Sequence, residues 1–274
     1  MAFFEDIIVC PVCGGKIASD EHTLFCERKH SFDISSAGYV NFNVRHTNTG
    51  DSKEMADARH RFLDKGYYRA FACGIADTLE SHKSRSVLDA GCGDGYYSVF
   101  AAQSAGDMKL IGFDLSKHSV SHAAKRARAA KISSRAAFFA AGIFELPVKS
   151  ESADTVLNLF APCAAAEFHR VLKKGGSLIM GAAGERHLLG LKKALYDRIY
   201  LNTPEKIAAP EGFNEKSRRR INYKVKIEGN DSIRDLFMMT PYYWKTGERD
   251  AQKLKSAQSL ETELDFEIIV FEKI

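Results

Sequence analysis

The stretch Val87–Ser98 constrains the fold of this chain more than any other, because it joins a buried strand, a glycine-rich turn and the start of a helix. A short apolar run predicts a strand that ends at Asp89. Gly91, Gly93 and Gly95 follow, and missing side chains at these positions let the backbone approach a ligand closely. The predicted helix begins directly after the last glycine. A strand, a turn and a helix in this order predict an α/β sheet with a nucleotide-type site.

The spacing of the glycines indicates which nucleotide the site takes. A dinucleotide fingerprint requires a glycine at position 96, which is a tyrosine here. Instead, Asp89 precedes the first glycine by two positions. S-adenosylmethionine carries a cationic sulfonium and an ammonium group but no phosphate, so a carboxylate at the strand end suits it. A second apolar run ends at Asp114, where an acid can accept both ribose hydroxyls. The sequence therefore predicts S-adenosylmethionine as the cofactor.

Composition sets the frame for this site. A chain of 274 residues that is 45% hydrophobic can bury the core of one large domain, with a small appendage. No apolar run approaches the ~20 residues that span a bilayer, and acids replace the basic flank of a signal peptide. Six cysteines do not indicate a disulfide framework, so a cytoplasmic protein without a membrane partner is expected. The net charge of +4 permits a nucleic-acid partner without requiring one.

Four potential metal ligands stand near the N-terminus, as a Cys-x2-Cys pair followed by a Cys-x3-His pair: Cys10, Cys13, Cys26 and His30. Three thiolates and one imidazole suit a closed tetrahedral zinc site. A redox role for the first pair would leave the second pair unexplained. With all four ligands from the protein, the zinc is structural and folds a module of about 35 residues. We expect a zinc-binding module at residues 1–42 and a main domain at residues 43–274.

The exit of the fourth predicted strand is the candidate wall for a target base. This strand covers Ala153–Phe160, and Phe160, Ala161 and Pro162 lie at its carboxyl end. In open α/β sheets the ends of the first and fourth strands flank the point where ligands bind. A nucleophilic Cys163 is the rival interpretation, but the sequence places no histidine to activate it.

A basic segment at residues 216–226 holds six positive residues and no acid. From Ile221 onward charged and apolar residues alternate, which puts Lys224 and Lys226 on one face of a strand. Such a stripe suits a phosphate backbone, although ordinary surface charge is the alternative. Arg45, in the predicted linker at residues 43–50, is a further candidate for a phosphate contact. The predicted RNA contacts are Arg45, Arg218, Arg219, Arg220, Lys224 and Lys226.

Helix signals complete the pattern. Asp51 is the expected cap of a helix, with Glu54 three residues on, and Ser116 is the expected cap of another. The basic residues of the second helix, Arg126 among them, are expected to form a solvated face. His187 follows the fifth predicted strand, where it either caps a helix or reaches the cofactor.

The whole chain resembles the bacterial large-subunit (23S) ribosomal RNA guanine-N1 methyltransferases with an N-terminal zinc finger, which include enzymes that give tylosin resistance. The matching stretches keep their order: Cys10–Cys13, Cys26–His30, Gly38–Asn41, Gly50–Ser52, Phe62–Tyr68, Asp89–Tyr97, Phe160–Cys163, Arg186–Leu188 and Met239–Pro241. The resemblance implies a class I S-adenosylmethionine-dependent methyltransferase with a Rossmann-like, seven-stranded, mostly parallel sheet. It also implies zinc at the four ligands, and a homodimer whose two zinc modules grip an RNA hairpin. Implied cofactor contacts are Tyr68, Gly93, Asp94 and His187.

Two other functions are compatible with the residues. One is a small-molecule methyltransferase whose zinc module is only structural. The other is a non-catalytic, zinc-dependent RNA-binding protein, although Asp89 and Asp114 have no physical purpose in an idle site. The sequence leaves open which guanine is modified and which group accepts its proton.

Overall fold

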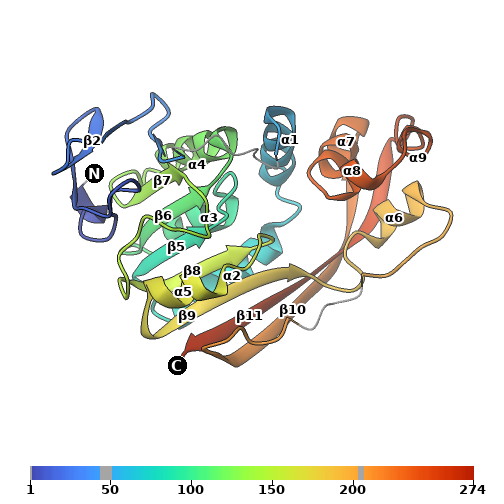
Figure 1. The fold of residues 1–274 in the computed structure, drawn as a ribbon. Helices are drawn as coiled ribbons and strands as arrows, with labels where there is room; N and C mark the ends of the chain where they lie inside the picture. Colours follow the sequence, from blue (N-terminus) through green and yellow to red (C-terminus); the bar gives the residue numbers. More distant parts are fainter. Residues whose placement is uncertain (1, 44–50, 203–206) are drawn as a thin grey trace.

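The computed structural model describes residues 2–43, 51–202 and 207–274, which form two sheets of different size (Figure 1). A short 3-10 helix, η1 (Ala2–Phe4), lies near the N-terminus. The smaller sheet is antiparallel and consists of β1 (Ile17–Ser19), β2 (Thr23–Cys26) and β3 (Ser31–Asp33). Arg45, a predicted RNA contact, lies outside the described residues.

The main sheet has the strand order β10-β11-β9-β8-β5-β6-β7-β4. Strands from β4 to β9 pair in parallel, and β11 runs antiparallel to its neighbours β9 and β10. The mostly parallel sheet is as predicted, but it has one strand more than the seven expected. The additional strand is β4, which comes from the N-terminal module and pairs with β7. The strands are β4 (Val40–Asn41), β5 (Ser86–Ala90), β6 (Lys109–Asp114), β7 (Ala136–Ala140), β8 (Ala153–Leu159), β9 (Leu172–Ala183), β10 (Phe213–Glu228) and β11 (Ser259–Lys273).

Most helices cover one face of this sheet, and α5 and the N-terminal module cover the other. Along β5, Val87 packs into the core formed with most of the helices, whereas Leu88 packs into the core shared by α5 and the N-terminal module. The parallel strands are thus buried on both faces, as their apolar runs predict. Within the described part of the chain, no helix combines the length and apolar character needed to cross a bilayer. The helices are α1 (Lys53–Asp64), α2 (Arg69–Ser81), α3 (Tyr96–Ser104), α4 (Lys117–Ala129), α5 (Ala165–Val171), α6 (Leu189–Leu195), α7 (Asn230–Met238), α8 (Tyr242–Lys245) and α9 (Glu248–Gln252).

The sheet reverses its strand order between β5 and β8, and this reversal positions the candidate site. The chain runs from β5 outward to β6 and β7, and then returns to β8 on the other side of β5. Ligands bind at the carboxyl ends of the strands at such a switch point. Asp89 lies near the end of β5, Asp114 ends β6, and Phe160 follows β8. The residues predicted to bind the cofactor and the base therefore gather at one edge.

The N-terminal module is packed directly onto the main sheet. Besides the pairing of β4 with β7, an isolated bridge joins Ile8 to Val148. The ring of Phe42 stacks on that of Phe139 with centroids 4.8 Å apart, and Phe139 in turn stacks on Phe113 at 5.6 Å. Aromatic pairs at these separations add to the hydrophobic stabilisation of a core. One continuous core therefore joins the metal-ligand module to the strands that carry the candidate site.

The helix caps agree with the sequence in one case and correct it in the other. Ser116 caps α4 as predicted, because its hydroxyl accepts a hydrogen bond from the N–H of Ser119. The cap of α1 is Ser52 and not Asp51, since the Ser52 hydroxyl accepts the N–H of Met55. Asp51 instead forms an ion pair with Arg59. α1 lies between α4 and α7, above the sheet edge that carries the candidate site (Figure 1).

Candidate functional site

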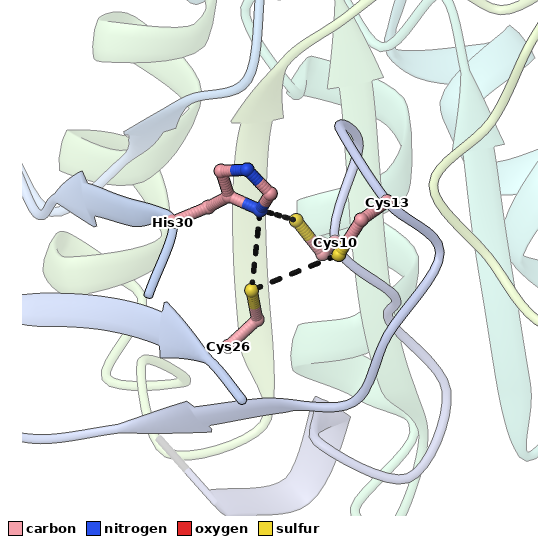
Figure 2. Close-up of side chains that lie close together, drawn as sticks. All are labelled: Cys10, Cys13, Cys26 and His30. Atoms are coloured by element: carbon pink, nitrogen blue, oxygen red, sulfur yellow. Dashed lines mark hydrogen bonds between the residues drawn. The ribbon is translucent and has the colours of Figure 1, made fainter. Parts of the chain in front are cut away.

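The four predicted metal ligands converge in the N-terminal module, as Figure 2 shows. Their ligand atoms all lie within 4.8 Å of one another. The Nδ1 atom of His30 is 3.6 Å from the sulfur of Cys10 and 3.4 Å from that of Cys26. The sulfurs of Cys13 and Cys26 are 3.8 Å apart. Zinc–ligand bonds of about 2.3 Å to sulfur and about 2.0 Å to nitrogen imply tetrahedral edges of about 3.8 Å and about 3.5 Å. These distances fit a zinc ion, held by the Nδ1 atom of His30.

The lowered pKa of one ligand, Cys26, also favours metal binding. Burial tends to raise the pKa of the Cys26 thiol, but backbone N–H groups around it and the His30 ring lower that pKa to about 7. A thiolate is the form that binds zinc. All four coordination positions are filled by the protein, so the site can support the fold but offers no open position for a substrate.

The glycine turn after β5 is shaped as the sequence predicts. Gly91, Gly93 and Gly95 all have positive φ angles, of 87°, 53° and 72°. A Cβ atom at Gly91 would lie 2.5 Å from the Cβ of Ala161, so this glycine is required by the close approach of the loop after β8. A Cβ at Gly93 would meet nothing within 4 Å, which leaves open space in front of the turn. The N–H of Gly93 donates to the carboxylate of Asp114 at 3.0 Å.

Three carboxylates around the turn differ in their charge states. Asp114 accepts the N–H groups of Gly93 and Ser116, and it keeps lone pairs for two further donors. Burial raises its pKa, and burial raises the pKa of Asp89 to about 7. Asp94 is the opposite case. Burial would raise its pKa, but hydrogen bonds from His60 and the charge of Arg126 lower it to about 2. Asp94 is therefore ionised at neutral pH, whereas Asp89 changes its charge there.

The partners of Asp94 were not identified from the sequence. His60 of α1 contacts its carboxylate at 2.9 Å, and Arg126 of α4 does so at 2.5 Å. Arg126 also forms an ion pair with Asp64, so it is not part of a solvated face as predicted. His60 further stacks on His122, with ring centroids 4.2 Å apart. The Asp94 carboxylate is thus bonded within the protein, and the Nε atom of Arg126 also donates to its backbone carbonyl at 3.1 Å.

The structure brings Tyr68 and His187 together, although 119 positions separate them in the chain. The Tyr68 hydroxyl lies 3.4 Å from the Nε2 atom of His187, and the Nδ1 atom accepts the backbone N–H of Asp265. This assigns the ring proton to Nε2. Burial lowers the pKa of His187 to about 4, so the ring is neutral at physiological pH. The histidine therefore presents a donor to the tyrosine and carries no charge.

The position of His187 depends on a buried ion pair. The carboxylate of Asp265 is inaccessible to solvent and accepts two hydrogen bonds from Arg220, at 2.7 Å and 2.6 Å. It also accepts the N–H of Arg186, directly before His187. Burial would raise the pKa of Asp265, but Arg220 and this N–H lower it. Arg220, predicted as a phosphate contact, thus has a structural role.

The other basic residues of the predicted RNA stripe lie on the surface of β10. Lys224 and Lys226 do share one strand face, but opposite them on β11 stand Glu263 and Glu261. Arg218 forms ion pairs with Glu215 and Glu267, Arg219 with Asp77, and Lys226 with Glu228. The stripe is therefore a row of cations along a row of acids, and its net field is weaker than the sequence of β10 alone suggests.

An aromatic wall stands where the sequence predicts the base pocket. Phe160 has a φ angle of 55° and keeps 47% of its surface exposed. Its ring lies 5.4 Å from that of Phe71 and 5.9 Å from that of Phe266, and the Phe266 ring also contacts His187 at 4.6 Å. A flat base can stack on such an exposed ring, since every base has an aromatic face. Phe160 is therefore the exposed member of an aromatic cluster that reaches His187 through Phe266.

Asn158 supports this wall from within β8. Its amide donates to the backbone carbonyls of Ala90 and Pro162, and so ties the ends of β5 and β8 together. Its buried carbonyl oxygen has no hydrogen-bond partner among the described residues. An unpaired buried acceptor costs free energy, which a bound donor would recover. A polar residue inside the apolar run Val156–Leu159 was the signal available in the sequence.

The groups of this edge fit S-adenosylmethionine. Asp89 can face the cation, Asp114 the ribose, and the open turn at Gly93 lets the backbone approach the ligand. Arg59 adds a cation that is only 24% exposed, bonded to Asp51 and to the carbonyl of Met239. Burial lowers the pKa of Arg59, but the charge and hydrogen bond of Asp51, with smaller contributions from Asp94 and Asp114, raise it above the usual value. An arginine near these acids can bind the carboxylate of S-adenosylmethionine.

Comparison with known sequences agrees with both parts of the molecule. A family described as "Methyltransferase domain" matches residues 81–220, and a zinc-ribbon family described as "RlmA, N-terminal" matches residues 8–44. The chain is 30% identical to "Putative 23S rRNA (guanine-N(1)-)-methyltransferase YxjB" of Bacillus subtilis (strain 168), over 95% of each protein. It is 32% identical to a 23S rRNA (guanine(748)-N(1))-methyltransferase of Streptomyces fradiae, over 86% of this chain and 85% of the relative.

A first prediction concerns the metal. Replacing a ligand by Cys13→Ser is expected to abolish stoichiometric zinc binding and to lower the melting temperature, because the module loses the bond that closes it. Metal content by mass spectrometry and thermal melting measure both effects. The control Cys73→Ser, on α2, should keep the zinc. Zinc retained by Cys13→Ser would contradict the assignment.

A second prediction separates two neighbouring arginines. Arg220→Gln leaves the buried Asp265 carboxylate without its cation, and we expect the free energy of unfolding to fall by about 2 kcal/mol. Fully buried pairs lose more, but half of the Arg220 side chain is exposed. Arg219→Gln breaks only a surface pair with Asp77, so a change below about 0.5 kcal/mol is expected. Urea denaturation compares the two, and equal losses would refute the structural role of Arg220.

Proposed function

The chain belongs to the 23S rRNA (guanine-N1-)-methyltransferase family with an N-terminal zinc ribbon, and from this we propose that it methylates N1 of a guanine in a hairpin of large-subunit ribosomal RNA. The observation that carries the proposal is the edge where Asp89 and Asp114 flank an open glycine turn beside the exposed ring of Phe160. A donor site and a stacking surface for a base thus lie side by side.

S-adenosylmethionine supplies an already activated methyl group, so the protein mainly provides alignment and removal of water. We propose that Asp89 faces the cationic part of the cofactor, Asp114 accepts its ribose hydroxyls, and the backbone from Gly91 to Gly95 surrounds it. Arg59 binds the carboxylate. Phe160, Ala161 and Pro162 hold the guanine, which has to be unstacked from its neighbours to reach the site.

Tyr68 and His187 form the remaining wall of the proposed cofactor site. Because the Nε2 proton of His187 points to the tyrosine oxygen, the Tyr68 proton is available to a different acceptor. Burial raises the pKa of Tyr68, so the hydroxyl stays protonated. We propose that this fixed donor orients the cofactor, and that Asp265 and Arg220 maintain the orientation through His187.

The ion pairs of β10 reduce the number of basic residues that we propose as RNA contacts. Arg219 and Lys226 are paired only with exposed acids, and such pairs contribute about 0–1 kcal/mol, so a phosphate can replace the acid. With Lys224 they remain our proposed phosphate contacts. Arg218 is held by two glutamates and Arg220 by the buried Asp265, which makes both less available.

The proposal extends to assembly and compartment. We propose a homodimer in which two zinc modules grip one RNA hairpin, as the resemblance implies. Val12 and Phe25 support this, because the module exposes both apolar side chains. A ribosomal RNA substrate also supports a cytoplasmic location. Light scattering of the purified protein tests the dimer directly.

The reaction itself is tested with purified protein, S-adenosylmethionine and a transcribed 23S rRNA fragment. We expect one methyl group per RNA, at a guanine whose blocked pairing edge stops reverse transcription. Asp114→Ala should abolish transfer. The control Asp154→Asn should not, because Asp154 pairs with Lys173 at the amino end of β8, away from the site. Methyl transfer only to small molecules, or to an RNA atom other than guanine N1, would overturn the proposal.

The charge state of Asp89 predicts a pH dependence. Its raised pKa, about 7, means that the carboxyl is largely neutral at about pH 6 and largely ionised at about pH 7.5. A cation binds the ionised form, so the affinity for S-adenosylmethionine should rise roughly eightfold over this interval. Calorimetry measures it. Asp89→Asn should bind weakly and without the pH dependence, whereas Asp114→Asn should bind weakly but keep it. An unchanged slope in Asp89→Asn would assign the titration to another group.

A further inference from the structure

A groove outside the proposed cofactor site is lined by residues of α7, of α8 and of α9 with the segment after it. These three helices lie together at the upper right in Figure 1, away from the C-terminus. The volume of the groove is about 370 Å³, which is within the range of small-ligand pockets. The function proposed above does not use this groove. Its lining residues are Asn230, Arg234, Phe237, Met238, Tyr243, Ala251, Leu254 and Lys255.

The chemistry of the lining points to an aromatic anion. Phe237 and Leu254 form an apolar floor, and the ring of Tyr243 lies 5.6 Å from that of Phe237. Two cations, Arg234 and Lys255, stand among the lining residues, and none of the residues named above is acidic. An apolar floor with two positive charges, which no acid of the lining balances, selects a ligand that carries both a flat apolar part and a negative group.

The rim of the groove exposes the only tryptophan of the chain. Trp244 keeps 65% of its surface accessible and Tyr243 keeps 38%, and their rings form a T-shaped pair at 5.3 Å. Large aromatic side chains are usually covered in a folded protein, because their exposure forfeits much hydrophobic stabilisation. Exposed aromatic surface beside an apolar groove is typical of binding surfaces.

Two contacts connect this groove to the proposed reaction site. The hydroxyl of Tyr242, next to the aromatic pair, bonds to Asn202, and the amide of Asn202 bonds to the backbone carbonyl of His187. On the other side, the carbonyl of Met239 accepts a hydrogen bond from Arg59. The segment that carries the exposed rings is therefore linked to His187 through Asn202 and to Arg59 directly.

We propose that this groove binds an unstacked nucleotide of the RNA substrate, near the methylated guanine in the chain. The base stacks on the exposed ring of Trp244 with its edge toward Tyr243, and Arg234 and Lys255 contact its phosphate. Stacking on exposed aromatic rings with neighbouring cations is a common mode of single-stranded RNA binding. The inference rests on the proposed function, since it names a second contact of the same substrate.

The lone tryptophan makes the proposal directly measurable. Titration of the full-length protein with the RNA hairpin should quench its intrinsic fluorescence, because a stacked base lies against the only indole. Trp244→Ala should raise the KM for RNA about tenfold, whereas Trp244→Phe, which keeps a ring, should restore most of the loss. Arg234→Gln should raise the KM too, and the control Arg85→Gln, at the amino end of β5, should not. The affinity for S-adenosylmethionine should stay unchanged in all four variants.

The possible outcomes separate this inference from the proposed function. A protein that methylates RNA, shows no quenching at saturation and keeps its KM in Trp244→Ala overturns the groove but leaves the function intact. Quenching without methylation supports the groove and refutes the function. A change in oligomeric state in Trp244→Ala, seen by light scattering, would make the surface an interface between copies and would also overturn the proposal.

Discussion

The main physical constraint on this molecule is the burial of several carboxylates at one edge of a parallel sheet. Each charge has to be compensated there, since an isolated buried carboxylate is costly. Asp94 is compensated by Arg126 and His60, Asp265 by Arg220, and Asp114 by two backbone N–H groups. Among the described residues no cation pairs with Asp89. Burial raises its pKa to about 7, although the side chain of Ser98 lowers it. It is therefore the carboxylate whose charge a bound cation would stabilise.

The sequence correctly predicted the features that depend only on residues close together in the chain. The turn after Asp89, the end of β6 at Asp114 and the four metal ligands each follow from spacing within a few tens of residues. Alternation in β10 correctly predicted that Lys224 and Lys226 share a face. It gave no indication of the acids on β11, because the register between two strands depends on contacts that no local pattern contains.

Ion pairs between distant segments explain the remaining differences. Arg126 looked like one charge of a solvated helix, and its role appears only when α1 and the glycine turn are packed beside α4. Arg220 looked like one of three equivalent arginines, yet only its side chain reaches the buried Asp265. The eighth strand of the main sheet arises differently, because the pairing of Val40 and Asn41 with β7 is a long-range backbone contact that no local pattern contains.

The helix α7 packs against the helix α1 and lines the groove. One of its faces binds α1, through the pairs of Arg61 with Asp235 and of Lys65 with Ser232. α1 in turn holds the glycine turn through His60 and Asp94. The other face of α7 carries Arg234 and the floor of the groove, at helical spacing from Asn230. A ligand in the groove would therefore contact α7, which packs on α1, and α1 in turn contacts the glycine turn. The groove and the glycine turn are therefore joined by a continuous series of packed helices, although they lie far apart in the sequence.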